Sequence, residues 1–167
     1  MKVLAFDPGY DRLGVAVMEL IDGSESLIHS ECVETDKQAD LSDRLYRLGQ
    51  VIESLMKKYQ PDCVGIETLF FNKNQNTAIG VAQARGIIIY LANSEGVTVY
   101  EFGPQEIKIA VTGYGKSDKS AVIDMVQRFG PLEDVNVNSD KDLAQVSIRI
   151  LFEFCSYLFV SYSENKV

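Results

Sequence analysis

The pattern of predicted elements indicates an α/β domain built on a five-stranded mixed sheet. Three strand-like segments follow one another near the N-terminus, which predicts an antiparallel meander. Two later apolar runs each follow a helical segment, which predicts parallel strands added to that meander. The chain has 167 residues, of which 46% are hydrophobic, and this suits one compact domain over residues 1–167 with helices flanking the sheet.

Each element is predicted from its own pattern. The strand-like segments are short and mostly apolar, and Asp22-Gly23 between the second and third is typical of a tight hairpin turn. The predicted strands span 2–7, 13–20, 26–34, 63–67 and 97–101. Helical spacing predicts an apolar stripe on the first helix, formed by Leu41, Leu45, Leu48, Ile52 and Leu55. The predicted helices span 40–59, 77–93, 103–111, 117–129 and 139–162.

Several classes of protein are disfavoured by the composition. The N-terminus lacks an export signal, and no stretch reaches the roughly 20 apolar residues that a membrane span needs. Cys32, Cys63 and Cys155 are odd in number and far apart, which argues against a disulfide framework. The single histidine, His29, has no neighbours for a zinc site or a catalytic triad. We therefore expect a soluble protein of the cytoplasm.

The net charge of −8 argues against general affinity for nucleic acid, because DNA-binding surfaces are usually basic. Acids clustered at a metal site would account for part of this charge. Basic residues that could line a groove are concentrated later in the chain: Lys73, Arg85, Lys108, Lys116, Lys119 and Arg128. The composition thus permits a local DNA-binding surface whose affinity depends strongly on salt.

Carboxylates stand at the ends of two predicted strands. Asp7 follows the apolar run 3–6 and precedes Pro8-Gly9, and Glu67 ends the apolar run 64–66. A third acidic group, residues 139–142, stands at the head of the last helix. Converging carboxylates repel one another and need cations between them, and carboxylate-bound Mg²⁺ keeps positions open for water and phosphate oxygens. These residues predict a metal-dependent enzyme acting on phosphodiesters.

Simpler interpretations stay open for the same residues. Asp7 also fits an ordinary acidic turn, or the hairpin of actin-like ATPases and sugar kinases, although 167 residues leave no room for their second domain. Asp140 and Asp142 follow Ser139 in an arrangement that also caps a helix. Phe70 can stack on bases or fold into the core. Arg85 can contact phosphate or pair with a surface acid.

The chain resembles the RuvC family of Holliday-junction resolvases, which have a ribonuclease H-like fold. The resemblance covers almost the whole length. It rests on Asp7-Pro8-Gly9, on Ile66-Glu67 with residues 70–74, on Gln83-Ala84-Arg85-Gly86, and on Lys108 and Lys119-Ser120. It implies a homodimeric, magnesium-dependent endonuclease that resolves four-way DNA junctions by paired nicks through two-metal hydrolysis.

The resemblance also implies roles for particular residues. Asp7, Glu67 and Asp142 would hold two Mg²⁺ ions, for which Mn²⁺ would substitute, and Asp140 would complete the ligand set. Lys108 and Lys119 would assist catalysis or grip the phosphate, and Phe70 would stack on a base. The remaining expected DNA contacts come from Lys73, Asn74, Arg85, Lys116 and Lys119. The helix 77–93 would form the dimer interface, unless its apolar stripe only covers the sheet.

One motif departs from the family pattern. The family usually has an acid or histidine three residues before its last acid, and here Ser139 stands at that position. The departure leaves open whether Ser139 or Asp140 fills the position, and it is compatible with a divergent or phage-type branch. It also keeps open a non-catalytic protein that binds branched DNA. The sequence specifies neither cut-site preference, nor activity on forks and flaps, nor a helicase partner.

Overall fold

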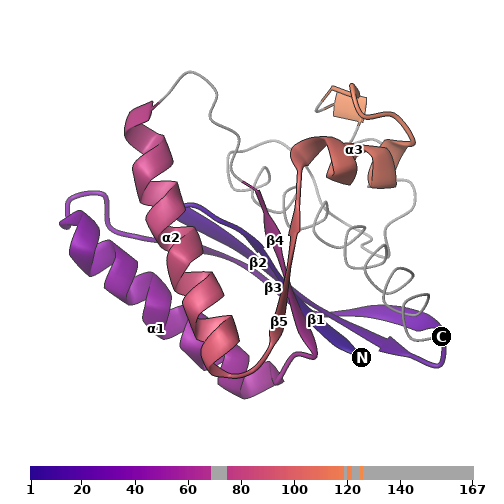
Figure 1. The fold of residues 1–167 in the computed structure, drawn as a ribbon, viewed down its shortest axis with the longest axis horizontal. Coiled ribbons are helices and arrows are strands. Elements are labelled where there is room, and N and C mark those ends of the chain that lie inside the picture. The colour runs from indigo at the N-terminus through magenta and orange to yellow at the C-terminus, as the bar shows by residue number, and fades with distance from the viewer. Residues whose placement is uncertain (69–74, 119, 122–124, 126–167) are drawn as a thin grey trace.

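The computed structural model of the chain describes residues 1–68, 75–118, 120, 121 and 125. These residues form one five-stranded sheet and three helices (Figure 1). The strands are β1 (Lys2–Asp7), β2 (Arg12–Ile21), β3 (Ser24–Glu34), β4 (Cys63–Glu67) and β5 (Thr98–Phe102). The helices are α1 (Leu41–Tyr59), α2 (Gln75–Ser94) and α3 (Pro104–Thr112). In this part of the chain, none of the helices has the length and apolar character that crossing a membrane requires.

Strand β1 lies at the centre of the sheet, whose order is β3-β2-β1-β4-β5. Strands β1 to β3 form an antiparallel meander, whereas β4 pairs parallel with β1 and β5 pairs parallel with β4. The carboxyl ends of β1, β4 and β5 therefore meet at one edge of the sheet, where open α/β sheets usually bind ligands. The predicted meander with added parallel strands is confirmed.

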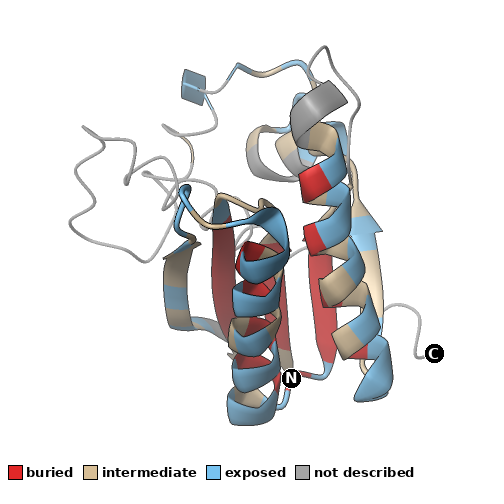
Figure 2. Cartoon of the chain, turned by 90° about the vertical axis from the view of Figure 1, so that its left-hand side faces the viewer, coloured by how far each residue is buried: buried red, intermediate tan, exposed pale blue. Residues whose placement is uncertain are grey.

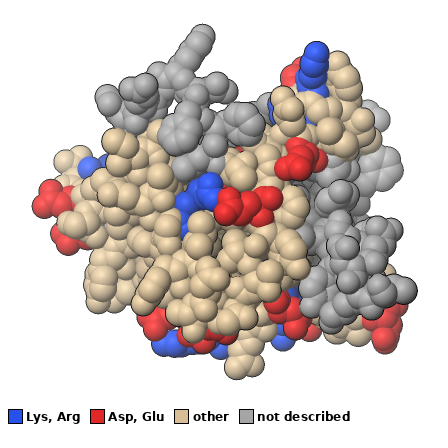
Figure 3. All heavy atoms as spheres, viewed as in Figure 1, with Lys and Arg blue, Asp and Glu red and all other residues tan. Residues whose placement is uncertain are grey.

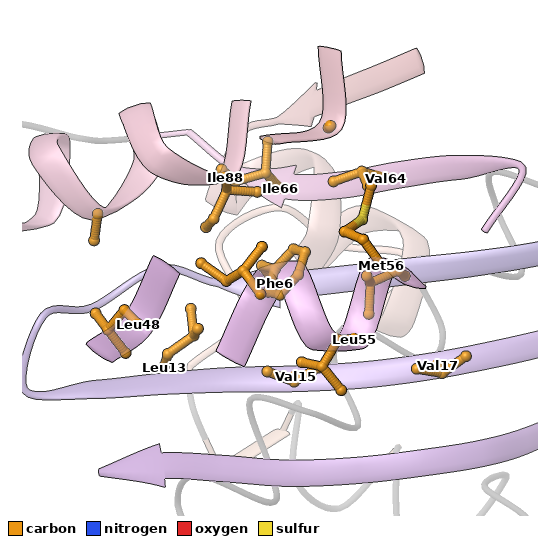
Figure 4. Packing of buried hydrophobic residues seen from close by; sticks show 14 residues of the cluster. Phe6, Leu13, Val15, Val17, Leu48, Leu55, Met56, Val64, Ile66 and Ile88 are labelled. Carbon is orange, nitrogen blue, oxygen red and sulfur yellow. The ribbon is translucent and has the colours of Figure 1, made fainter. Parts of the chain in front are cut away.

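Helices α1 and α2 cover one face of the sheet, which we call the helix face (Figure 2). Their apolar side chains pack on fully buried strand residues such as Phe6, Val15 and Ile66 (Figure 4). A smaller buried cluster lies on the opposite face and contains Val3, Ala5, Ala16, Met18 and Cys63. Successive residues of β1 and β4 thus alternate between the helix face and the opposite face.

The observed elements agree with the predicted ranges to within two residues at each end. Asp22 and Gly23 have φ angles of 52° and 79°, the pair of positive values that a type I′ hairpin turn requires. One irregularity was not predicted, since the β2–β3 register shifts between Val17 and Met18 and leaves Ile28 as an extra residue of β3. Most of the predicted helix 117–129 and all of the predicted helix 139–162 lie outside the described residues.

The buried stripe of α1 differs from the predicted stripe at its N-terminal end. Leu48, Ile52 and Leu55 are buried as predicted, whereas Leu41 is 37% exposed. Arg44, which is 8% exposed, takes the inward position one turn before Leu48. The physical reason is that Arg44 finds hydrogen-bond partners in the segments that lie against this end of α1.

Replacing Leu48 by alanine should destabilise the fold by about 2–5 kcal/mol, because the substitution leaves a cavity between α1 and the sheet. Urea unfolding followed by far-UV circular dichroism measures this loss. Leu41→Ala is the matched control on the same helix, and its effect should stay below about 1 kcal/mol because Leu41 is exposed. Equal losses for the two variants would contradict the observed orientation of α1.

Candidate active site

The two carboxylates predicted at strand ends lie on neighbouring strands. Asp7 is the last residue of β1 and Glu67 the last of β4, and the preceding residues, Phe6 and Ile66, are partners in the parallel register. Alternation along the strands puts both acids on the face opposite the helices, in line with Cys63. The fold therefore brings together two of the predicted metal ligands.

The charges of these two acids are coupled. Burial, and then the charge of Asp7, raise the pKa of Glu67 from 4.5 to about 7. A nearby cation would stabilise the ionised form of Glu67 and lower this pKa again. Carboxylate oxygens are the ligands that Mg²⁺ and Mn²⁺ prefer, so the pair fits the predicted cation. Within the described ranges, no group of three or more His, Cys, Asp or Glu side chains is arranged to hold a metal ion.

The turn that follows Asp7 requires glycine at position 9. A Cβ atom on Gly9 would collide with the backbone carbonyl oxygen of Arg12. The turn itself gives a sufficient steric reason for glycine at this position.

Arg44 of α1 contacts the same turn from the helix face. Its guanidinium donates hydrogen bonds to the carbonyl oxygen of Tyr10 at 3.3 Å, to Oγ1 of Thr35 at 3.0 Å, and to the carboxylate of Asp11. The guanidinium carbon also lies 4.8 Å from the centroid of the Tyr10 ring. Thr35 completes the group, since its hydroxyl donates to the Tyr10 carbonyl oxygen at 2.6 Å. We call Tyr10, Asp11, Thr35 and Arg44 the turn clamp.

The turn clamp was not predicted from the sequence. A positive charge on an amphipathic helix usually belongs to its solvated face, and Arg44 was therefore not singled out. A usable signal was present, because Arg44 precedes Leu48 by one turn and so falls on the apolar stripe. A buried arginine needs hydrogen-bond partners, which here come from segments far away in sequence.

Within the described residues, two of the predicted basic residues follow β5. Helix α3 begins two residues after the end of β5 (Figure 1). It carries Lys108, which is half-buried. Lys116 is exposed in the segment after α3. This segment forms a turn in which Ser117 N donates to the Tyr114 carbonyl oxygen at 3.1 Å. Both lysines thus belong to the part of the chain that continues from the carboxyl edge of the sheet.

Arg85 lies on the other side of the sheet from Asp7 and Glu67. Its guanidinium pairs with the carboxylate of Glu101 on β5, and its side chain is 14% exposed. Glu101 is on the helix face, because it alternates with Tyr100 and Phe102, which pack on the opposite face. Acidic and basic side chains adjoin on the surface over α2 and β5 (Figure 3). The ion pair matches the simpler interpretation of Arg85, and its contact with phosphate stays a prediction.

The remaining predicted site residues lie outside the described residues. They are Phe70, Lys73, Asn74, Lys119, Asp140 and Asp142. Cys155 also falls there, whereas Cys32 and Cys63 are free cysteines. Burial raises the pKa of the Cys63 thiol to about 12 and, together with nearby acids, raises the pKa of Cys32. Both thiols are therefore protonated at neutral pH, and Cys63 belongs to the buried apolar cluster of the opposite face.

Comparison with known families identifies the chain. The family model described as Crossover junction endodeoxyribonuclease RuvC matches residues 3–148. The chain belongs to the RuvC family. The predicted resemblance to that family is thereby confirmed.

Relatives and solved structures within the RuvC family agree with this assignment. The Crossover junction endodeoxyribonuclease RuvC of Caldanaerobacter subterraneus subsp. tengcongensis is 41% identical over 81% of this chain and 82% of its own length. The RuvC of Caldicellulosiruptor saccharolyticus is 35% identical over the whole of both chains. Thermus thermophilus RuvC in complex with a Holliday junction substrate matches with a TM-score of 0.77 and 28% identity, over 91% of this chain and 93% of that chain. The predicted ribonuclease H-like fold is confirmed.

In this RuvC-family chain, the raised pKa of Glu67 predicts a pH-dependent stability without metal. The folded state holds the Glu67 proton up to about pH 7, whereas the unfolded state releases it near pH 4.5. Stability therefore falls as the pH rises between these values. Glu67→Gln cannot ionise, so in EDTA it should equal the wild type at pH 4 and exceed it at pH 8. The gain at pH 8 should be at most roughly 3 kcal/mol.

Thermal unfolding in EDTA across this pH range measures the difference between wild type and Glu67→Gln. Asp7→Asn is an informative second variant, because removing the Asp7 charge removes part of what raises the Glu67 pKa. Its loss of stability between pH 4 and pH 8 should therefore be smaller than that of the wild type. A difference that is constant from pH 4 to pH 8 would rule out the coupled pair.

Proposed function

We propose that this RuvC-family chain is a structure-selective endonuclease that resolves Holliday junctions and related branched DNA by paired, magnesium-dependent nicks. The observation that carries the proposal is the pair of neighbouring strand-end acids, Asp7 and Glu67, in a chain whose relatives are named crossover junction endodeoxyribonucleases. The Thermus homologue in complex with a Holliday junction supports the choice of substrate. Forks and flaps are further candidate substrates.

Asp7 and Glu67 would hold divalent cations, with Asp140 and Asp142 supplying the remaining carboxylates. Two bound Mg²⁺ ions supply the charge that activates a water molecule and stabilises the leaving 3′ oxygen in phosphodiester hydrolysis. The raised pKa of Glu67 supports this role. It reflects burial and repulsion from Asp7, and a bound dication would relieve that repulsion. Asp7 ends β1, the central strand of the sheet.

The basic residues would act on the DNA. Lys108 and Lys119 would neutralise charge that develops on the phosphate, and Lys116 would contact the backbone. Phe70 would stack on a base next to the cut, while Lys73 and Asn74 would contact the strand that carries it. For Arg85, whose guanidinium already pairs with Glu101, phosphate contact would require exchange of that partner.

Resolution of a four-way junction needs two active sites, which a two-fold dimer supplies. The outer surface of α2 supports a dimer interface, because Ile79 and Tyr90 are 65% and 71% exposed. Between them, Gly86 has open space where a Cβ would stand, so packing among the described residues gives no reason for glycine there. An apolar groove of about 580 Å³ runs along this surface between α1 and α2, and Tyr46, Ile87 and Tyr90 are among its lining residues.

Asp7→Asn should abolish nicking of a four-way junction and leave junction affinity nearly unchanged. The substitution removes one negative charge from the metal site and leaves the basic residues intact. The measurement is single-turnover cleavage of labelled four-way junctions in Mg²⁺, with affinity measured by gel shift in Ca²⁺. Linear duplex and forked DNA serve as substrate controls, and Asp22→Asn, in the exposed hairpin turn, serves as the matched variant control.

The same assay separates the enzyme from a second candidate, a non-catalytic protein that binds branched DNA. Ser139, at a position where the family usually has an acid or histidine, is the feature that favours this candidate. A wild-type chain that binds junctions tightly but nicks none of the substrates in Mg²⁺ or Mn²⁺ would establish binding without catalysis.

Tyr90→Glu should convert a dimer into a monomer, because it puts a charge within the proposed apolar interface. Sedimentation velocity should show a wild-type species of twice 18.6 kDa and a variant species of 18.6 kDa. Tyr114→Glu is the matched control, since Tyr114 is 61% exposed and lies on the turn after α3. A wild-type chain that sediments as a monomer at working concentrations would exclude the dimer.

A further inference from the structure

The turn clamp connects the predicted metal site with the helix face of the sheet. Asp7 ends β1, and its backbone pairs with Gly14 of β2. The residues between them form the turn, and two of these, Tyr10 and Asp11, belong to the clamp. The side chains of Asp7 and Tyr10 serve different faces, because Asp7 shares a face with Ala5 whereas Tyr10 packs with the core of the helix face.

Arg44 makes more contacts with this turn than a buried ion pair alone would need. A single carboxylate partner would neutralise its charge, but the guanidinium also donates to the Tyr10 carbonyl oxygen and to Thr35 Oγ1. Its planar group lies over the Tyr10 ring as well. A planar fork with several donors can hold two backbone segments in a fixed relation, which a lysine cannot do to the same extent.

Helix α2 holds the clamp from the other side. A Cβ atom at Gly80 would lie 2.5 Å from Cδ1 and 2.8 Å from Cε1 of the Tyr10 ring, so the ring fills the space beside the helix backbone. Tyr10 is thus fixed between the guanidinium from α1 and the backbone of α2. The turn has little freedom to move toward or away from the helices, and this restricts the strand end from which Asp7 projects.

We propose that Arg44 is a positioning residue for the metal site: by fixing the turn through Tyr10, Asp11 and Thr35, it holds the Asp7 carboxylate at the distance from Glu67 that divalent cations require. The inference rests on the proposed function of these two acids as metal ligands. Arg44 does not touch the cations or the DNA in this mechanism. It acts through the backbone of the turn.

Arg44→Met tests the proposal, because methionine keeps an unbranched apolar side chain but loses every donor. Residues that orient metal ligands typically contribute a factor of about 10–100 in metal affinity or activity. Arg44→Met should therefore weaken Mn²⁺ binding to the DNA-free protein by about tenfold, measured by electron paramagnetic resonance of the unbound Mn²⁺. The Mg²⁺ concentration for half-maximal junction nicking should rise by a similar factor. Junction affinity in Ca²⁺ should stay within about twofold, because Arg44 is not among the predicted DNA contacts.

Arg47→Met is the matched control, since Arg47 is exposed on the same helix one turn away. It removes the same charge from α1 and should leave all three measurements unchanged. Arg44→Lys should recover part of the loss, because it restores the charge without the planar fork. All measurements are made at a temperature at which circular dichroism shows each variant to be folded. Arg44→Met with the Mn²⁺ affinity and the Mg²⁺ dependence of Arg47→Met would overturn the proposal.

Thr35→Val covers the case in which Arg44→Met does not fold. It keeps the shape of the side chain and removes the hydroxyl that links Arg44 to the Tyr10 carbonyl oxygen. It should weaken Mn²⁺ binding in the same direction, and an unchanged affinity would equally count against positioning by the clamp. Failure of the proposed function gives a different result: wild-type protein then nicks no junction in Mg²⁺, while Mn²⁺ binding still reports whether Arg44 positions the acids.

Discussion

Two acids that repel each other are held together at the ends of adjacent parallel strands in this fold. Neighbouring strands are about 4.8 Å apart, and the chain ends β1 with Asp7 and β4 with Glu67 at matched positions in the register. Folding therefore brings the two acids together on a face where burial already disfavours charge. The packing of Leu4, Phe6 and Ile66 under α1 and α2 holds the strands in this register despite the repulsion. A divalent cation would convert the same repulsion into affinity.

The two faces of the sheet have different roles. The helix face holds the larger core, the Arg85–Glu101 ion pair and the turn clamp. The opposite face carries the strand-end acids above a smaller apolar cluster. Successive residues of β1 therefore belong alternately to the larger core and to the face that carries the acids. This explains how a rigid core can support a site that is itself electrostatically unfavourable.

Local patterns in the sequence predicted most of the fold because each pattern has a local cause. Strand alternation, helical spacing and the Asp22-Gly23 turn all act within a few residues, and the boundaries they predict for the described elements agree with the structure to within two residues. The burial of Arg44 depends on hydrogen-bond partners 9 to 34 positions away. The bulge at Ile28 depends on how β3 pairs with β2. No local pattern specifies either feature. Asp7 and Glu67 could be predicted as a pair because strand ends converge by topology alone. Their coupled charges follow from burial, which only the packed structure reveals.

The contact between Tyr10 and Gly80 has a consequence for how chains with this fold can diverge. The aromatic ring and the missing Cβ occupy complementary volume across two elements separated by about half the described chain. A larger residue at position 80 would collide with the Tyr10 ring, so it requires that the ring move or that a smaller residue stand at position 10. Among relatives with the same backbone, side-chain size at these two positions should be inversely correlated, so that evolution passes from one pairing to the other through paired substitutions rather than single ones.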